Sequence, residues 1–150
     1  MAIARGAGTE IIRSASFEYV DSNTTAQCMI FGVQHHIYTV LSIVCYAVAT
    51  SGGLSFYIQG YDVVGGETTE TITMFDTGQT LAGDTFVWND KFGFNGHEPT
   101  DFTGTLDSIA KQDAIADQAE GSKPQKLFML KSANADQFDV HITYLDQNNA

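Results

Sequence analysis

The sequence predicts an all-β protein, an antiparallel, jelly-roll-like β-sandwich of about eight strands. Three observations support this fold class. Several segments alternate apolar and polar residues with the two-residue period of a strand. Clusters of Gly, Asn, Asp and Ser separate these segments, as turns between short strands require. Strand patterns do not alternate regularly with helical patterns, which disfavours a parallel α/β sheet.

The expected strands follow the apolar segments in order. They cover residues 10–20, 26–33, 37–48, 54–63, 69–75, 84–94, 126–131 and 137–145. A jelly roll brings strands that are distant in sequence together, so the last of these segments is expected beside the first.

Three segments show a one-sided pattern clearly. Phe86, Trp88, Phe92 and Phe94 share one face of their segment, and Phe138, Val140, Ile142 and Tyr144 share one face of the last segment. In the first segment, Ile11, Ala15, Phe17 and Tyr19 share a face. Each apolar row is expected to face the core, with polar residues on the other side.

The stretch VQHHIYTVLSIVCYAVA, residues 33–49, needs a separate explanation because it is apolar on every side. A helix that spans a bilayer needs about 20 apolar residues, and this run is shorter. It is also rich in Val, Ile, Tyr and Thr, whose side chains favour a pleated strand. The stretch is therefore predicted to be a strand.

Regular alternation would give this strand two apolar faces. One face would carry Ile37, Thr39, Leu41, Ile43, Cys45 and Ala47, and the other would carry Tyr38, Val40, Ser42, Val44, Tyr46 and Val48. A strand with one wet face should show a polar row, and neither row is polar. The second face is therefore expected to be covered by another sheet layer, a chain arm or a neighbouring subunit.

The remaining segments complete the predicted organisation. Residues 106–120 have a possible N-cap at Thr105 and stop signals at Gly121 and Pro124, so a short helix is expected there, with a loop as the alternative. Residues 1–9 are rich in Gly and Ala and are expected to form a flexible N-terminal arm, without the apolar core of a signal peptide. Residues 10–150 are expected to form a single domain.

Charge and cysteine content exclude several classes of function. The formal net charge is −11, with seven basic residues in 150. Binding of nucleic acid requires Lys and Arg that displace counterions from phosphates, and anionic membrane surfaces need the same charge. Neither partner is therefore expected. Cys28 and Cys45 lie in apolar runs and are expected to be reduced core residues.

Possible reaction and metal sites lack the spacing that their chemistry needs. His35 and His36 are neighbours in a strand, so their rings are expected to point to opposite faces. His97 and Glu98 precede a proline and lack the second histidine of a zinc-binding helix. Trp88, Tyr57 and Tyr61 could form a platform that stacks on a sugar, but core positions are the plainer interpretation. The sequence therefore predicts no enzyme, no catalytic residue, no metal and no cofactor.

Two segments, VQHHIYTVLSIVCYAVA and FVWNDKFGFNGHEP, resemble small virion proteins of tailed bacteriophages, the class that includes capsid decoration, or cement, proteins. The resemblance covers residues 4–99. It implies a jelly-roll or related β fold, a trimer, and a place on the capsid surface where the protein clamps neighbouring capsomers. It also implies synthesis in the host cytoplasm and no chemistry of its own.

These lines of reasoning give one functional expectation and two alternatives. We expect a self-associating decoration protein, a homotrimer that binds the major capsid protein. The alternatives are a tail, baseplate or fibre subunit, and a carbohydrate-binding sandwich that recognises a receptor. The residues expected to contact other copies or the partner are Ile3, Arg5, Tyr38, Tyr46 and Val48.

Overall fold

The structure is a computed structural model that describes residues 9–20, 26–50, 52–62, 68–98, 107–110, 123–131 and 138–148. The strands found in these ranges are β1 (Thr9–Val20), β2 (Gln27–Phe31), β3 (His36–Ala47), β4 (Leu54–Asp62), β5 (Thr68–Asp76), β6 (Thr85–Trp88), β7 (Phe92–Asn95), β8 (His97–Glu98), β9 (Lys123–Pro124), β10 (Lys126–Lys131) and β11 (Phe138–Asn148).

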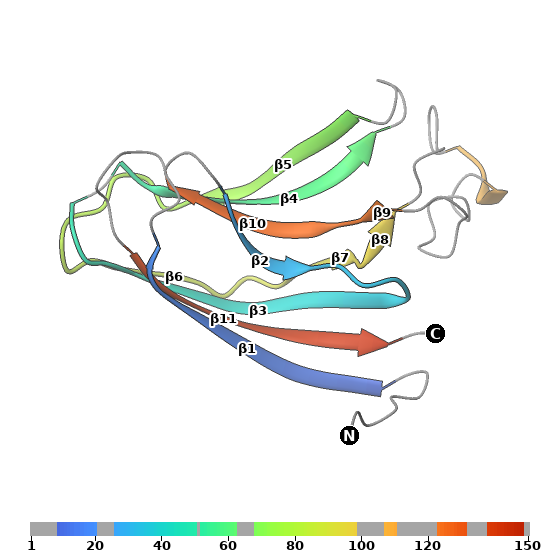
Figure 1. The fold of residues 1–150 in the computed structure, drawn as a ribbon, viewed down its shortest axis with the longest axis horizontal. Coiled ribbons are helices and arrows are strands. Elements are labelled where there is room, and N and C mark those ends of the chain that lie inside the picture. Colours follow the sequence, from blue (N-terminus) through green and yellow to red (C-terminus); the bar gives the residue numbers. More distant parts are fainter. Residues whose placement is uncertain are drawn as a thin grey trace.

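Two antiparallel sheets lie face to face (Figure 1). Sheet A has the order β1-β11-β3, and β6 and β7 pair in turn with the free edge of β3. Sheet B has the order β2-β10-β4-β5. The short strands β8 and β9 pair with each other as a separate two-stranded sheet. In Figure 1, β4 and β5 diverge from sheet A toward the end where β1 begins.

The order of the strands is that of a jelly roll. The chain passes from β1 in sheet A to β2 in sheet B, and it changes sheet repeatedly until β11 returns to sheet A. As a result β11 pairs with β1 along its length, from Thr9 opposite Asn148 to Phe17 opposite Val140. The predicted fold class and the predicted neighbourhood of the first and last strands are both confirmed.

The elements differ from the prediction in detail. The expected strand 84–94 is two strands, β6 and β7, because the chain breaks the ladder between Trp88 and Phe92. Strand β1 begins at Thr9, which was assigned to the arm, and residues 1–8 lie outside the described residues. Most of the expected helix 106–120 also lies outside them, and only Ile109 and Ala110 are described as helical.

The core lies between the sheets and is built from the predicted apolar rows. Its buried members are Met29, Ile30, Tyr38, Val40, Ile43, Cys45, Ala47, Leu54, Phe56, Ile58, Phe75, Phe94, Leu127, Met129, Phe138, Val140 and Ile142. The side chains of Phe86, Trp88 and Phe92 pack against this cluster, as their shared face predicted. Burial of apolar surface of this kind is the main source of stability in such a domain.

A β-bulge in β3 corrects the predicted faces of this strand. Thr143 of β11 pairs with Ser42 and Tyr144 pairs with Val40, so Leu41 is an extra residue in β3. The bulge shifts the alternation by one residue. Tyr38 and Val40 therefore face the core before the bulge, and Ile43, Cys45 and Ala47 face it after the bulge.

Two glycines allow the sheets to approach each other near the β2–β3 turn. The Gly32 amide donates to the Gln125 carbonyl (2.8 Å), and the Gln125 amide donates to the Gly96 carbonyl (2.9 Å). A Cβ atom on Gly96 would lie 1.8 Å from the Val33 carbonyl oxygen, and one on Gly32 would lie 2.1 Å from the Gly96 carbonyl oxygen. The crossing of these backbones therefore requires glycine at both positions.

Candidate interaction surface

The outer face of sheet A is the side of β1, β11, β3 and β6 that points away from sheet B. It carries the residues that alternate with the buried ones. The cross-strand partners Ser16, His141, Val44 and Val87 form one row across the four strands. Tyr46 lies opposite Asp139 in a second row. Apolar residues therefore occur on a sheet face that is usually polar when it contacts only water.

Several apolar side chains on the outer face of sheet A are strongly exposed. Ile12 is 70% exposed, Val87 is 53% exposed and Tyr46 is 43% exposed. Leu41 and Val44 are half-buried. The expected apolar second face of β3 is therefore present, although its members differ from those predicted because of the bulge.

A groove of about 380 Å³ lies on this face, at the end of the sheet where β1 finishes and β11 begins. It is lined by Ser16, Phe17, Glu18, Val44, Tyr46, Asp139, Val140 and His141. We call it the β1–β11–β3 groove. Its apolar wall comes from Val44 and Tyr46, and its two carboxylates come from Glu18 and Asp139.

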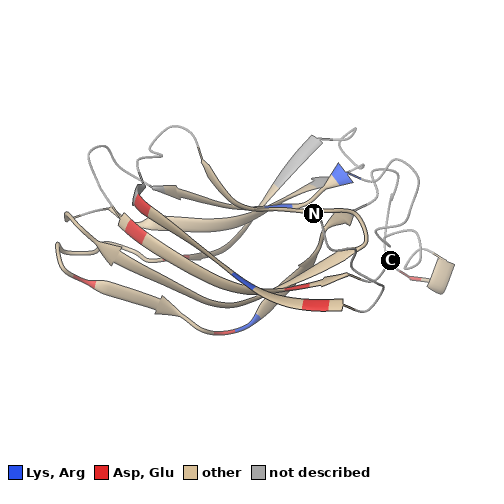
Figure 2. Ribbon diagram, turned by 60° about the horizontal axis from the view of Figure 1, so that its bottom comes forward, with Lys and Arg blue, Asp and Glu red and all other residues tan. Residues whose placement is uncertain are grey.

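The charge of the groove is one-sided. Among the residues that line it, Glu18 and Asp139 are acidic and none is Lys or Arg. In Figure 2 acidic positions, drawn in red, occur on the neighbouring strands of sheet A at this end. Ser16 and His141 make a hydrogen bond on the groove wall, with 2.6 Å between Oγ and Nδ1. The groove therefore combines an apolar wall with acidic and hydrogen-bonding side chains.

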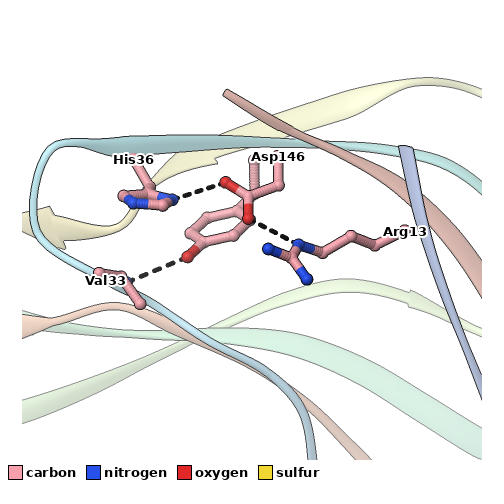
Figure 3. A network of polar contacts seen from close by, with 5 residues as sticks. Arg13, Val33, His36 and Asp146 are labelled. Carbon is pink, nitrogen blue, oxygen red and sulfur yellow. Dashed lines mark hydrogen bonds and ion pairs between the residues drawn. The ribbon is translucent and has the colours of Figure 1, made fainter. Parts of the chain in front are cut away.

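Polar side chains inside the sandwich form a separate network at the other end of sheet A (Figure 3). The Asp146 carboxylate is 3% exposed and accepts a hydrogen bond from Arg13 Nε at 2.8 Å. Its other oxygen lies 2.6 Å from His36 Nδ1. The Val33 amide donates to the Tyr38 hydroxyl at 3.2 Å. The network therefore joins β1, β11, β3 and the β2–β3 turn.

The environment of this network changes the acidity of its tyrosines. Burial raises the pKa of Tyr38 to about 12, and the nearby Asp146 carboxylate adds to the rise. Burial also raises the pKa of Tyr144. The contacts of Asp146 with Arg13 and His36 tie β1, β11 and β3 together at this end of the sandwich.

The outer face of sheet B also carries aromatic residues. Phe31 is 59% exposed, and the Lys126 ammonium lies 4.9 Å from the centre of its ring. Tyr57 and Phe128 stack across neighbouring strands, with 5.4 Å between ring centres. Burial raises the pKa of the half-buried Cys28 thiol beside them. Both sides of the sandwich thus expose apolar surface.

The five predicted contact residues have different positions. Tyr46 lies in the groove and is exposed, and Val48 follows β3 at the same end and is half-buried. Tyr38 is 3% exposed and stacks on Phe94 inside the protomer, because the bulge turns it toward the core, so it is not part of the surface described here. Ile3 and Arg5 lie outside the described residues.

The histidines do not gather around a common point. His36 points into the sandwich toward Asp146, whereas His35 lies in the turn with φ 66°. His141 is on the outer face of sheet A. Among the described residues, no group of three or more His, Cys, Asp or Glu side chains is placed to hold a metal ion.

Trp88 is not available as a platform for a sugar ring. Its ring lies parallel to that of Phe75, with 4.2 Å between the centres and 4° between the planes. The residue comes from sheet A and its partner from sheet B, so the stack fills the space between the sheets. The alternative of a carbohydrate-binding sandwich therefore cannot use Trp88 as its stacking residue.

A second hollow, of about 400 Å³, lies between the sheets where they diverge. It is lined by Ile37, Ile58, Ile72, Gly93, Phe94, Asn95 and Gln125. None of these side chains ionises or acts as a nucleophile. The hollow offers shape and apolar surface but no group for chemistry.

Comparison with known proteins gives no family. No family model matches the chain, and no curated protein matches it. One similar solved structure is from the Bacillus endospore appendages, a family of disulfide-linked pili (12% identity, TM-score 0.43, 100% of this chain and 97% of that chain). Another is from the infectious bursal disease virus Gx strain (10% identity, TM-score 0.38), where 91% of this chain covers 31% of that chain. Both TM-scores are too low to support a conclusion about function.

None of the helices in the described part of the chain is long and apolar enough to cross a membrane.

Sequence reasoning found part of the groove and missed the rest. Tyr46 was predicted, but Val44, Glu18 and Asp139 were not. The alternation pattern placed Val44 and Tyr46 on one face, and that signal was correct. The acidic residues could not be found in the same way, because their approach depends on the pairing of β1 with β11, which are more than a hundred residues apart.

Proposed function

We propose that this chain is a non-enzymatic structural subunit of a virion and that it acts by associating with copies of itself. In more detail, we propose a capsid decoration protein of a tailed phage. It would form a homotrimer, bind the major capsid protein and stabilise the head from its outer surface.

The observation that carries this proposal is the apolar surface on the outer faces of both sheets. On sheet A, Ile12, Val87 and Tyr46 are exposed, and on sheet B, Phe31 is exposed beside the stacked pair Tyr57 and Phe128. Exposed apolar side chains that a single core does not need are typical of surfaces that contact other proteins.

The fold and the sequence resemblance add support. Capsid domains, lectins and cupins all use the jelly roll, so the topology is compatible with a virion protein but does not select one of these functions. The resemblance of residues 4–99 to small phage virion proteins supports the proposed virion, trimer and capsid partner.

The proposal is tested by two measurements on the purified chain. Light scattering over a range of concentrations should give a molar mass close to three times that of the 16.3 kDa protomer. Antibodies against the chain should then label virions by electron microscopy. Label on heads supports a decoration protein, and label on tails supports the tail subunit. Absence of the chain from purified virions would refute both.

A further inference from the structure

The outer face of sheet B is the side of β2, β10, β4 and β5 that points away from sheet A. Its residues alternate along each strand with buried members of the core. Cross-strand pairing arranges them in rows, and the middle row contains Cys28, Phe128, Tyr57 and Thr73. These side chains are half-buried or exposed. A row without any charged residue therefore crosses all four strands.

The rows on either side of the middle row carry little charge. They contain Phe31, Lys126, Gln59 and Thr71 on one side, and Leu130, Ser55 and Asp76 on the other. Among the described residues of this face, only Lys126 and Asp76 are charged. Lys126 lies over the ring of Phe31, and the Asp76 carboxylate accepts hydrogen bonds from the Ser55 hydroxyl and the Gly78 amide. Few charges and several aromatic rings are typical of the core of a protein–protein interface.

The net charge of the chain decides which of the two outer faces can meet a copy of itself. The chain carries a formal charge of −11, and the exposed Glu10 and Glu18 lie on the outer face of sheet A, on the same side of β1 as Ser16. Two copies that met through that face would bring like charges together, which disfavours the contact. The outer face of sheet B can meet its own copies without opposing such carboxylates.

The size of this face indicates how strong the contact would be. Strand β4 has nine residues, so it is about 30 Å long, and four strands side by side span about 19 Å. The face therefore covers at most about 570 Å², below the roughly 800 Å² per partner of a standard interface and typical of the weaker specific ones. Association through this face should consequently depend on protein concentration.

We propose that the outer face of sheet B is the surface through which copies of this chain associate, with Phe128, Tyr57 and Phe31 packed against the same face of neighbouring copies. This assignment rests on the proposed self-association and specifies its contact. Homo-oligomers are mostly closed and symmetric, and in the proposed trimer three of these faces would meet around the axis. The outer face of sheet A, with Glu10 and Glu18, would then point away from the axis.

A mixing experiment with charged variants tests the assignment. Tyr57→Glu and Tyr57→Lys should each weaken association at least about ten-fold, because each places like charges together where the faces meet. An equal mixture of the two variants should recover most of the association, because a face that meets its own copies then brings opposite charges together. Sedimentation equilibrium over a range of concentrations measures the association, and circular dichroism verifies the fold of each variant.

A second pair and a control pair make the outcome decisive. Thr73→Glu and Thr73→Lys place the same charges beside Tyr57 at an exposed position, so they serve if the Tyr57 variants do not fold. Val87→Glu and Val87→Lys, on the outer face of sheet A, should leave association unchanged.

The possible failures of this assignment and of the proposed function differ. Dissociation by the Val87 variants alone would overturn the assignment and leave the proposed self-association intact. Variants on sheet B that dissociate singly and do not recover when mixed would show that this face meets a different surface, which also overturns the assignment. A full chain that stays monomeric at every concentration would overturn the self-association itself.

Discussion

The indole ring of Trp88 lies parallel to the ring of Phe75, 4.2 Å away, and this contact joins sheet A to sheet B. Phe86 and Phe56 also stack on Phe75, at 5.8 Å and 4.6 Å. Four aromatic rings from both sheets thus form one contact near the middle of the sandwich. Aromatic contacts of this kind add specific geometry to the burial of apolar area.

Replacement of Trp88 by alanine should therefore destabilise the fold strongly. We expect Trp88→Ala to lower the free energy of unfolding by about 3–5 kcal/mol, as large-to-small changes of aromatic core residues do. Urea unfolding followed by circular dichroism measures the change. Val87→Ala is the control, because Val87 is the outward-facing neighbour and is 53% exposed. An equal loss in the two variants would contradict the core position of the indole.

The buried carboxylate of Asp146 should also contribute to stability. Asp146→Ala leaves Arg13 and His36 without their partner inside the end of the sandwich. Breaking a buried pair costs about 3–5 kcal/mol, and the partial exposure of Arg13 should reduce this to about 2–3 kcal/mol. Asp90→Ala, at an exposed position, should cost less than about 0.5 kcal/mol. Comparable effects of the two substitutions on urea midpoints would refute a structural role for the network.

The sandwich could be predicted from the sequence because its two signals, alternation and turn residues, each lie within a short segment of the chain. Alternation placed Phe86, Trp88 and Phe94 on the core side, and the turn residues separated the long strands, although 84–94 is two strands, β6 and β7. The faces of β3 could not be predicted in the same way. The bulge at Leu41 occurs where the partner of β3 changes from β7 to β6, and that change is a property of the tertiary pairing.

The site was predicted less completely than the fold. Tyr38 and Tyr46 were placed on one face by regular alternation, and the bulge separates them into core and surface. Glu18 and Asp139 meet only because the jelly roll pairs the first strand with the last. Sequence patterns report which side chains share a face, but they do not report which strands become neighbours.

The bulge gives a test based on deletion. Removal of Leu41 leaves Val40 and Ile43 on the core face, because the extra residue is the one that is lost. We expect this variant to fold, with β3 as a regular strand. Removal of Val44 instead misplaces core residues in either arrangement. With the bulge kept, Cys45 and Ala47 turn away from the core, and with the bulge lost, Ile43 turns outward and Ser42 turns inward. Unfolding of the first variant and folding of the second would refute the proposed position of the bulge.

Stability should fall in alkaline solution. Burial raises the pKa of the Cys45 thiol to about 12 and that of Tyr38 to about 12. Both groups stay protonated in the folded chain at pH values where they ionise in the unfolded chain. Their contribution to stability is therefore complete below about pH 9 and is lost progressively as the pH rises toward about 12.

Urea midpoints measured from pH 7 to 12 should show this decline. Cys45→Val removes one of the two buried ionisable groups while it keeps an apolar side chain, so its midpoints should decline less steeply above pH 9 than those of the unaltered chain. Thiol labelling at pH 8 provides an independent measurement. The half-buried Cys28 should react before the buried Cys45, which requires unfolding for access. Rapid labelling of both thiols in the folded protein would contradict the burial of Cys45, and with it the pKa that explains the alkaline decline.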